Sequence, residues 1–383
     1  MTAFTADDKR FMKKALEMAE RGRGRTVPNP MVGAVIVKDG VILSKGYHHK
    51  AGKDHAEIDA IKNSPAPVRG STIYVTLEPC TVSGKTPPCA DELIRRGFSR
   101  VVIAAVDPNP EVMGEGIRKL EAAGIEVDQG LYEDKAKKQN EVFFKNMITG
   151  MPFVCAKIAS SIDGKLAAPT SDSKWITGTI SRKKVQDLRW EYGCILTGIN
   201  TVLADDPALF PRQKLDGDLK ENIDSFLERD GSGRFARVIL DKKLRIPRDS
   251  SIARTADRIR TIIFTGSTRK KTSFDDHINL EYKSSGSWKL REILKLLYDK
   301  YDINSVMVES GPTMLTSFLN EGLIDKFLFF IAPRIIGGRD AYTMFNDTGV
   351  KMIKDSIGIS FDSFGSSGDD ILITAYPSRE KGI

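Results

Sequence analysis

The sequence predicts an α/β protein made of two successive domains. Its 383 residues are more than one hydrophobic core usually serves. Segments with strand periodicity alternate with segments that have the periodicity of an amphipathic helix, and this alternation is typical of α/β folds. A Gly150-Met151-Pro152 break interrupts the alternation, which then starts again. We therefore expect one domain over residues 1–149 and a second over residues 150–383.

The first domain is expected to hold a sheet with helices on both faces. Residues 7–22 have helical periodicity that ends at Gly22, and residues 31–47 predict a hairpin with Asp39-Gly40 at its turn. Asp54 is a candidate N-cap for a helix within 55–63. Further strands are expected at 71–78, 99–107 and 125–131, and further helices at 89–97, 115–124 and 133–147.

The second domain continues the alternating pattern, and the chain shows no internal repeat. Residues 213–234 are polar and contain glycines, so we expect a surface insertion there. Strands are expected at 153–160, 192–198, 236–241, 260–266, 305–310 and 326–332, and helices at 179–191, 288–299 and 313–321.

The composition is ordinary for a soluble globular protein, with 40% hydrophobic and 28% charged residues. The longest apolar runs, 101–106 and 327–332, have the length of a strand and are too short to cross a membrane. The first residues are charged and lack the apolar region of a signal peptide, so we expect a cytoplasmic protein with no membrane partner. The net charge of +7 is shared almost equally by the two domains, which favours small anionic ligands over a nucleic acid.

The chain has four cysteines, which in a cytosolic protein are expected to be thiols or metal ligands. Cys155 and Cys194 lie in apolar, strand-like runs, so we interpret them as small buried hydrophobic residues. Cys80 and Cys89 lie among prolines and polar residues, and this setting requires another explanation.

His55, Cys80 and Cys89 make a good zinc set that leaves the fourth position open for water. Cys89 is placed at the start of an expected helix, where free amides and the helix dipole favour a thiolate. Glu57 follows His55 by two residues and is a candidate to move protons between the water and a substrate. A structural zinc would need a fourth ligand, and no further Cys or His follows at finger-like spacing. We therefore expect one catalytic zinc ion per chain.

A histidine and glutamate in H-x-E spacing, followed by Pro-Cys and a second Cys, form the signature of zinc-dependent nucleobase deaminases. Here eight residues separate the cysteines, where most such enzymes have two. That loop and the motifs at 26–37, 46–57 and 106–110 resemble the deaminase domain of the bifunctional riboflavin-biosynthesis deaminase–reductases. The resemblance continues through the second domain in KIASSIDGKLA, SKWIT, TVLADDPAL, VESGPTML and APRIIGG.

The resemblance implies a cytidine-deaminase-like three-layer domain followed by a dihydrofolate-reductase-like α/β domain. It also implies a phosphorylated pyrimidine substrate, 2,5-diamino-6-(ribosylamino)pyrimidin-4-one 5′-phosphate. The first domain would replace the 2-amino group by oxygen, and the second would reduce the ribosyl group to ribityl with NADPH. The product would be 5-amino-6-(ribitylamino)uracil 5′-phosphate.

Site residues follow from the same resemblance. In the deaminase pocket the substrate-binding residues would be Asn29, His48 and Lys85. In the reductase the cofactor-binding residues would be Ala159, Trp175, Thr201, Asp205, Gly311, Pro312, Thr313, Met314, Leu315, Thr316 and Ser317. The substrate side of the reductase would hold Ser173, Arg189, Leu209, Arg212 and Glu309. This sequence departs from the family pattern at two places, Asp59 and Val82-Ser83, where the family often has histidine. Both departures concern contacts with the substrate.

Some of the expected reductase residues are also supported by their own chemistry. No G-x-G-x-x-G follows the first strand of the second domain, so an ordinary Rossmann fold is excluded. Gly311 precedes an expected helix whose free amides could bind a pyrophosphate, although without the family resemblance a plain capped helix is the favoured alternative. Arginines 189 and 212 can bind phosphate with two hydrogen bonds, and Lys157 with Glu309 could polarise sugar hydroxyls. The basic run 269–271 could meet the 2′-phosphate of NADP or could be a solvated charge run.

Three other functions are each compatible with part of the sequence. A tRNA adenosine deaminase would share the zinc chemistry but would have a basic domain facing nucleic acid. A free cytidine or dCMP deaminase would leave the second half of the chain unexplained. A nucleotide-binding module with an inactive deaminase half is disfavoured because the zinc ligands and Glu57 are intact. By size, the protein is expected to be a homo-oligomer.

Overall fold

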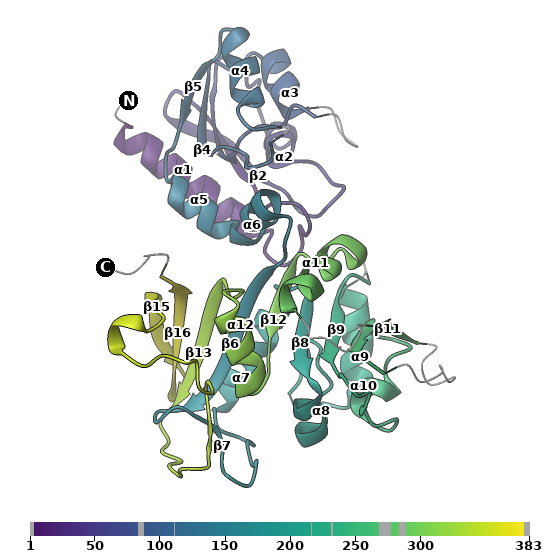
Figure 1. Cartoon of the computed structure of the whole chain (residues 1–383). Helices are drawn as coiled ribbons and strands as arrows, with labels where there is room; N and C mark the ends of the chain where they lie inside the picture. Colours follow the sequence, from purple (N-terminus) through teal and green to yellow (C-terminus); the bar gives the residue numbers. More distant parts are fainter. Residues whose placement is uncertain are drawn as a thin grey trace. The chain divides into compact units, whose positions relative to one another are not determined.

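The structure is a computed structural model that describes residues 4–82, 88–110, 112–215, 217–230, 233–267, 277–282 and 289–378. The chain divides into two compact units, Met1–Gly150 and Met151–Ile383. Each unit is built around its own sheet with helices packed on both faces (Figure 1). In the described residues, no helix is long and apolar enough to span a bilayer.

The first unit has a five-stranded sheet in the order β2-β1-β3-β4-β5. Strand β1 is antiparallel to both of its neighbours, whereas β3, β4 and β5 run parallel. The strands are β1 (Gly33–Lys38), β2 (Val41–Tyr47), β3 (Thr72–Leu77), β4 (Arg100–Ala105) and β5 (Glu126–Gln129). The helices are α1 (Ala6–Glu20), α2 (Ala56–Lys62), α3 (Cys89–Arg96), α4 (Glu115–Ala122), α5 (Glu133–Gln139) and α6 (Glu141–Thr149).

Alternating residues of this sheet enter two separate cores. In β3, Ile73 and Val75 pack in the core that includes α2, α3 and α4, whereas Tyr74 packs with α1 and α5. Two glycines allow the helices to lie close to the sheet. A Cβ on Gly33 would lie 2.0 Å from the carbonyl oxygen of Ala15 in α1, and one on Gly46 would lie 2.2 Å from the amide nitrogen of Ala60 in α2.

The expected hairpin, strands and helices of the first unit are present, with two differences. The N-cap of α2 is His55, and Asp54 instead forms an ion pair with Lys62, so the expected capping by Asp54 is wrong. The helix expected over 133–147 is interrupted at Asn140. That side chain is buried and pairs with both backbone groups of Met31, and its φ of −111° ends α5.

The second unit has a nine-stranded sheet in the order β11-β10-β9-β8-β12-β6-β13-β16-β15. It is parallel from β11 to β13, and β16 and β15 are added antiparallel at one edge. Its strands are β6 (Phe153–Ser161), β8 (Cys194–Gly198), β9 (Ala236–Leu240), β10 (Thr261–Thr265), β11 (Ile278–Tyr282), β12 (Ser305–Val308), β13 (Lys326–Ala332), β15 (Ile359–Ser367) and β16 (Asp370–Pro377). A separate pair is formed by β7 (Lys165–Ala167) and β14 (Tyr342–Thr343).

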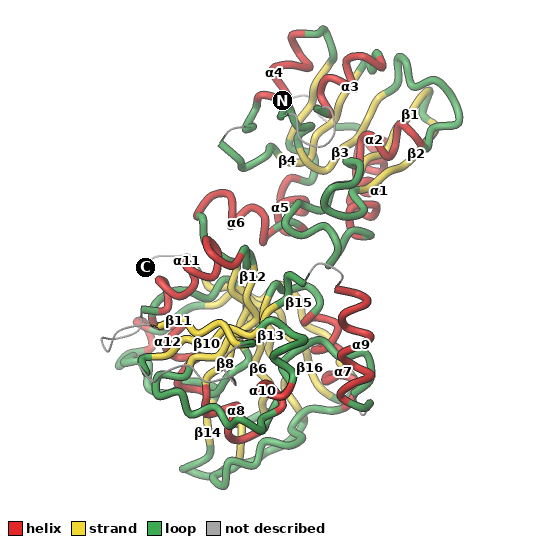
Figure 2. Tube along the Cα trace, turned by 90° about the vertical axis from the view of Figure 1, so that its right-hand side faces the viewer, coloured by secondary structure: helices red, strands yellow, loops and turns green. Residues whose placement is uncertain are grey.

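Helices cover both faces of this sheet, as the second view of the trace also shows (Figure 2). The core on one face includes residues of α11 and α12, and the core on the other includes residues of α8, α9 and α10. The helices are α7 (Thr179–Arg189), α8 (Ile199–Asp205), α9 (Leu219–Asp230), α10 (Ser251–Arg254), α11 (Leu290–Tyr301) and α12 (Pro312–Asn320), with a 3₁₀ turn at Ile353–Asp355.

The prediction of a surface insertion over residues 213–234 is wrong. Its described part contains α9, whose Ile223 and Phe226 are each 2% exposed and enter the core. The ring of Phe226 packs against the rings of Phe210 and Phe235. The apolar residues of α9 are Leu219, Ile223, Phe226 and Leu227, which follow the i, i+4, i+7, i+8 spacing of one helix face, so the sequence did carry a signal for this helix.

Candidate active sites

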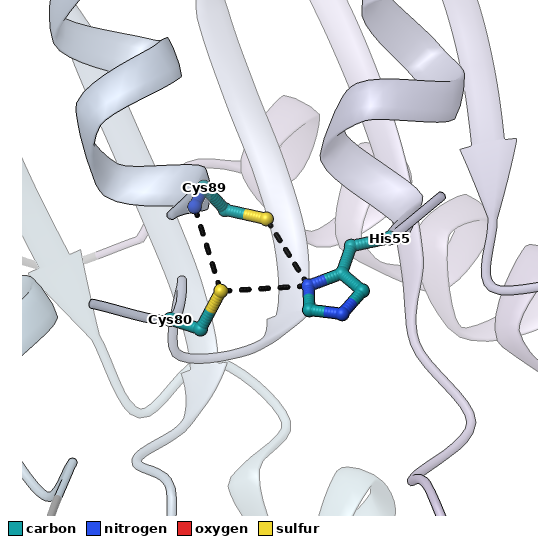
Figure 3. Close-up of side chains that lie close together, drawn as sticks. All are labelled: His55, Cys80 and Cys89. Carbon is teal, nitrogen blue, oxygen red and sulfur yellow. Dashed lines mark hydrogen bonds between the residues drawn. The ribbon is translucent and has the colours of Figure 1, made fainter. Parts of the chain in front are cut away.

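Three metal-ligating side chains converge at one edge of the first sheet. His55 is the N-cap of α2, Cys89 is the first residue of α3, and Cys80 lies three residues after β3. The His55 Nδ1 atom lies 3.4 Å from the Sγ of Cys80 and 3.3 Å from the Sγ of Cys89 (Figure 3). The amide nitrogen of Cys89 also donates to the Sγ of Cys80 over 3.4 Å. The structure therefore brings together the three expected ligands.

This donor set fits a zinc ion. One nitrogen and two sulfur atoms lie within 4.8 Å of one another. Tetrahedral zinc with bonds of about 2.3 Å to sulfur and about 2.0 Å to nitrogen separates the two kinds of ligand by about 3.5 Å. The observed nitrogen–sulfur distances are close to that value. The hydrogen bond with Cys80, followed by burial and the nearby charges of Glu57 and Cys80, raises the pKa of the Cys89 thiol, and a cation between the two sulfurs would offset these negative charges.

Glu57 lies in the first turn of α2 and is only 3% exposed. Burial, followed by the nearby charge of Cys80, raises the pKa of its carboxyl group to about 7. A carboxyl group with this pKa can accept and return a proton near neutral pH, as a general acid and base must. The structure thus gives Glu57 the environment that its expected role requires.

Two of the three expected substrate residues of the deaminase lie beside the metal ligands. His48 is buried, and its ring packs edge-on against the His55 ring with centroids 5.5 Å apart. Its Nδ1 donates to the carbonyl of Asp54 over 2.9 Å, and burial lowers its pKa. The neutral ring therefore accepts from the Asn29 side-chain amide at Nε2, over 3.1 Å. Lys85, the third expected residue, lies outside the described residues.

The sequence departure at Asp59 has a local explanation. Its carboxylate accepts a hydrogen bond from the Tyr47 amide over 3.0 Å and pairs with His49 over 3.2 Å. The rings of Tyr47 and His49 are stacked, with centroids 3.8 Å apart. Asp59 thus fixes the chain that leads from β2 to His48. Val82, the other departure, is 53% exposed, and Ser83 lies outside the described residues.

Two acidic residues near the metal site, Glu78 and Asp107, are not among the expected site residues. Glu78 is buried, and its carboxylate accepts hydrogen bonds from four backbone amides of residues 107–117, over 2.9–3.3 Å. Asp107 follows β4, and burial is the main cause that raises its pKa to about 6. The only signals in the sequence were the LEPC and VDPNP motifs that contain these residues.

A buried ion cluster marks the second candidate site. Glu309, directly after β12, lies 3.0 Å from the Nζ of Lys157 and binds Arg189 through two hydrogen bonds of 2.6 and 3.0 Å. The neighbouring cations Arg189 and Lys157 outweigh burial and hold the pKa of Glu309 at about 2. The remaining terminal nitrogen of Arg189 donates to Gln186 and to the carbonyl of Phe210. Arg189 is therefore mainly paired with the Glu309 carboxylate. The sequence predicted that Arg189 binds phosphate and did not predict this ion pair.

Other expected reductase residues lie near these strand ends. The Ser173 hydroxyl donates to the Asp205 carboxylate over 3.2 Å, which links the expected substrate and cofactor sides. Leu209 is 3% exposed and has a positive φ of 49°. The Arg212 amide donates to Gln186, the residue that also contacts Arg189. Ala159 lies in β6 and Thr201 in α8.

The start of α12 is open in the way a ligand site requires. Among the residues that the structure describes, no side chain caps this helix, and Pro312 occupies its first turn. A Cβ on Gly311 would meet nothing within 4 Å, and the φ of this residue is an ordinary −75°. Leu315 is fully buried in the core, and its amide donates to the Gly311 carbonyl over 3.2 Å. Pro312, Thr313, Met314, Thr316 and Ser317 lie in the same helix.

Comparison with protein families gives a match for each unit. Residues 5–105 match the family described as cytidine and deoxycytidylate deaminase zinc-binding region, and residues 152–372 match the RibD C-terminal domain. The chain is 41% identical over 366 residues to the riboflavin biosynthesis protein RibD of Aquifex aeolicus, covering 96% of this chain and 97% of that protein. It is 36% identical to RibD of Haemophilus influenzae, with 100% of both chains covered.

Solved structures agree with these matches. Acinetobacter baumannii RibD has a TM-score of 0.84 and 37% identity, with 97% of this chain and 99% of that chain covered. A Thermotoga maritima protein described as a diaminohydroxyphosphoribosylaminopyrimidine deaminase/5-amino-6-(5-phosphoribosylamino)uracil reductase has a TM-score of 0.82 and 35% identity over the same shares. The expected pairing of a cytidine-deaminase-like domain with a dihydrofolate-reductase-like domain is confirmed.

The geometry of the first site predicts the metal content of the protein. Purified chain should hold about one zinc ion, and Cys80→Ser or Cys89→Ser should release it, because each change removes one of three protein ligands. Cys194→Ala is the matched control, since that thiol is buried in the second unit. Metal analysis after dialysis measures the result. Full zinc retention in both serine variants would overturn the ligand assignment.

Proposed function

The chain belongs to the RibD family of bifunctional deaminase–reductases of riboflavin biosynthesis, and from this we propose where and how its two reactions take place. Deamination of 2,5-diamino-6-(ribosylamino)pyrimidin-4-one 5′-phosphate is assigned to the unit that holds His55, Cys80 and Cys89. Reduction of the ribosyl group to ribityl is assigned to the unit that holds Glu309. The observation that carries the first assignment is the buried carboxyl group of Glu57 beside the three metal-ligating groups.

In the deaminase, Glu57 moves the protons. Zinc held by His55 and the two thiolates would lower the pKa of a water molecule toward neutrality. Glu57 takes a proton from the attacking water, delivers it to the ring nitrogen and then helps to protonate the leaving amine. Asn29 and His48 are proposed to hold the pyrimidine, because their paired side chains lie beside the ring of His55. Lys85 is retained as a substrate contact on the family resemblance alone.

In the reductase, NADPH supplies the hydride when it is bound. The uncapped start of α12 is proposed to bind the anionic part of the cofactor through free amides, with Gly311 allowing close approach. The other proposed cofactor contacts are Ala159, Trp175, Thr201, Asp205, Pro312, Thr313, Met314, Leu315, Thr316 and Ser317. Preference for NADPH over NADH stays a proposal from the family, because residues 269–271 lie outside the described part of the chain.

The substrate side of the reductase is proposed around Glu309. Its charge is fixed by Lys157 and Arg189, so it suits hydrogen bonds to sugar hydroxyls rather than proton transfer. Because Glu309 engages Arg189 through both carboxylate oxygens, we assign phosphate binding primarily to Arg212. Ser173 and Leu209 complete the proposed substrate side.

We also propose that the protein forms a homo-oligomer through β15. This strand lies at the edge of the large sheet and pairs on one side with β16. Its residues 359–366 are all exposed, including Phe361 at 66% and Phe364 at 81%. Edge strands with large exposed apolar side chains are prone to pair with another chain. None of the four cysteines forms a disulfide, which suits the proposed cytoplasmic location.

Replacement of Glu57 should separate the two reactions. Glu57→Gln keeps the shape of the side chain but cannot carry the proton, so deamination should fall at least about a hundredfold. Zinc content and reduction of the already deaminated substrate should be unchanged, because neither depends on this carboxyl group. The measurement is the rate of each half-reaction on the full chain, with metal analysis alongside. Normal deamination by Glu57→Gln would mean that another group carries the proton.

Substitution of Gly311 should test the cofactor site. Gly311→Val should weaken NADPH binding about tenfold or more, because the added side chain occupies open space at the helix start. Its effect on binding of the deaminated substrate should be much smaller. Glu133→Val is the control, since the Glu133 side chain is 42% exposed in the first turn of α5, in the first unit. Separate titrations with NADPH and substrate measure both effects, and equal NADPH affinity in the two variants would contradict the proposed site.

The oligomer proposal predicts a particle larger than the monomer in analytical ultracentrifugation. Phe364→Lys should shift it toward the monomer, because a charged side chain on an edge strand opposes strand pairing. Ile148→Lys is the control, since Ile148 is 69% exposed in the first unit. A monomer for the unaltered chain at micromolar concentration would overturn the proposal.

A further inference from the structure

Trp175 is an exposed aromatic residue whose ring carries a cation over one face. Its side chain is 59% exposed, although a large indole gains most from burial. The guanidinium of Arg182, in α7, lies over the ring, with the carbon 4.2 Å from the ring centroid. A cation at this distance over an indole is held by the charge distribution of the ring. One face of Trp175 is therefore occupied by Arg182, and a planar ligand would have to use another part of the ring.

Arg182 is itself held in place. Its Nη2 donates to the Thr179 hydroxyl over 3.0 Å within the first turns of α7. The start of α7 is fixed to the sheet, because the Gly178 amide donates to the buried Asp370 carboxylate over 2.8 Å. Ser181 adds hydrogen bonds to Ser367 of β15. A continuous series of contacts thus connects the sheet edge through α7 to the exposed indole.

We propose that Arg182 is a positioning residue for the nicotinamide cofactor, holding the Trp175 ring in the orientation that binds it. This inference rests on the proposed function, in which Trp175 contacts the cofactor. An exposed tryptophan without such a partner would sample several rotamers, and ordering it on binding would lower the affinity. Arg182 removes part of that cost before the cofactor arrives. The contribution of Arg182 to cofactor affinity therefore requires the Trp175 ring. A direct attraction between Arg182 and the cofactor phosphates would not require it.

The test is a double-mutant cycle on the full chain, with NADPH as the titrant. Arg182→Gln should weaken NADPH binding about two- to fivefold, the range of one exposed cation–aromatic contact. Trp175→Ala should weaken it more. In the Trp175→Ala background, Arg182→Gln should have no further effect, because the ring to be positioned is gone. Arg182→Lys should restore part of the affinity, since an ammonium also stacks on the ring.

The matched control is Arg229→Gln, which removes the same kind of contact from Trp190, with a spacing of 4.1 Å, elsewhere in the second unit. It should leave NADPH affinity unchanged. The fluorescence of Trp175, taken as the difference from Trp175→Phe, should change in Arg182→Gln before any ligand is added. The KM for the pyrimidine substrate should stay constant in all these variants.

Three outcomes overturn the inference in distinguishable ways. If Trp175→Ala binds NADPH normally, the proposed cofactor role of Trp175 fails and the inference fails with it. If Trp175→Ala weakens binding but Arg182→Gln does not, only the inference fails. If the two changes are additive, Arg182 acts on the cofactor directly rather than through the ring.

Discussion

Both sites depend on one constraint of α/β folds, that parallel strands end together and helices begin just beyond them. Helix starts carry free amides, and loops at this edge can present polar side chains without burying unpaired backbone. In the first unit, Cys80 follows β3, and His55 and Cys89 stand at the starts of α2 and α3. In the second unit, Glu309 and Gly311 separate β12 from α12. The sheets thus determine where chemistry can occur in each unit.

Two buried carboxylates show how surroundings assign opposite roles to the same group. Glu57 is buried beside the Cys80 thiolate, and the pKa of the Glu57 carboxyl group rises to about 7. Glu309 is buried between Lys157 and Arg189, and its pKa stays at about 2. A group that titrates near neutral pH can exchange protons, whereas one that remains ionised can only orient or bind. The same ion pair affects Arg189. Because the Glu309 carboxylate neutralises its guanidinium, Arg189 attracts a phosphate less strongly than the sequence predicts.

The sequence could predict the features that are written in local patterns. The Asp39-Gly40 turn and the helix end at Gly97 depend on residues adjacent in sequence, and both are present. The three zinc ligands were predicted because one histidine and two cysteines form a zinc donor set, and because the H-x-E and Pro-Cys motifs are local patterns. The break at Asn140 depends instead on Met31, which lies 109 residues away. The contact between Arg189 and Glu309 spans 120 residues, and no local pattern records it.

Burial explains the remaining differences. Helix α9 was missed although Leu219, Ile223, Phe226 and Leu227 have helical spacing, because the polar residues and glycines around them indicated a surface loop. Strand β15 was missed for a different reason, because its exposed residues include serines, a glycine and an aspartate that are uncommon in strands. Its order comes from pairing with β16 rather than from its own composition. Likewise, the contact that orients Trp175 comes from Arg182 on the next helix, so a motif that contains the tryptophan describes only half of the arrangement. A motif thus contains the residues that contact a ligand. The residues that orient them lie elsewhere in the sequence and reach them only through tertiary contacts.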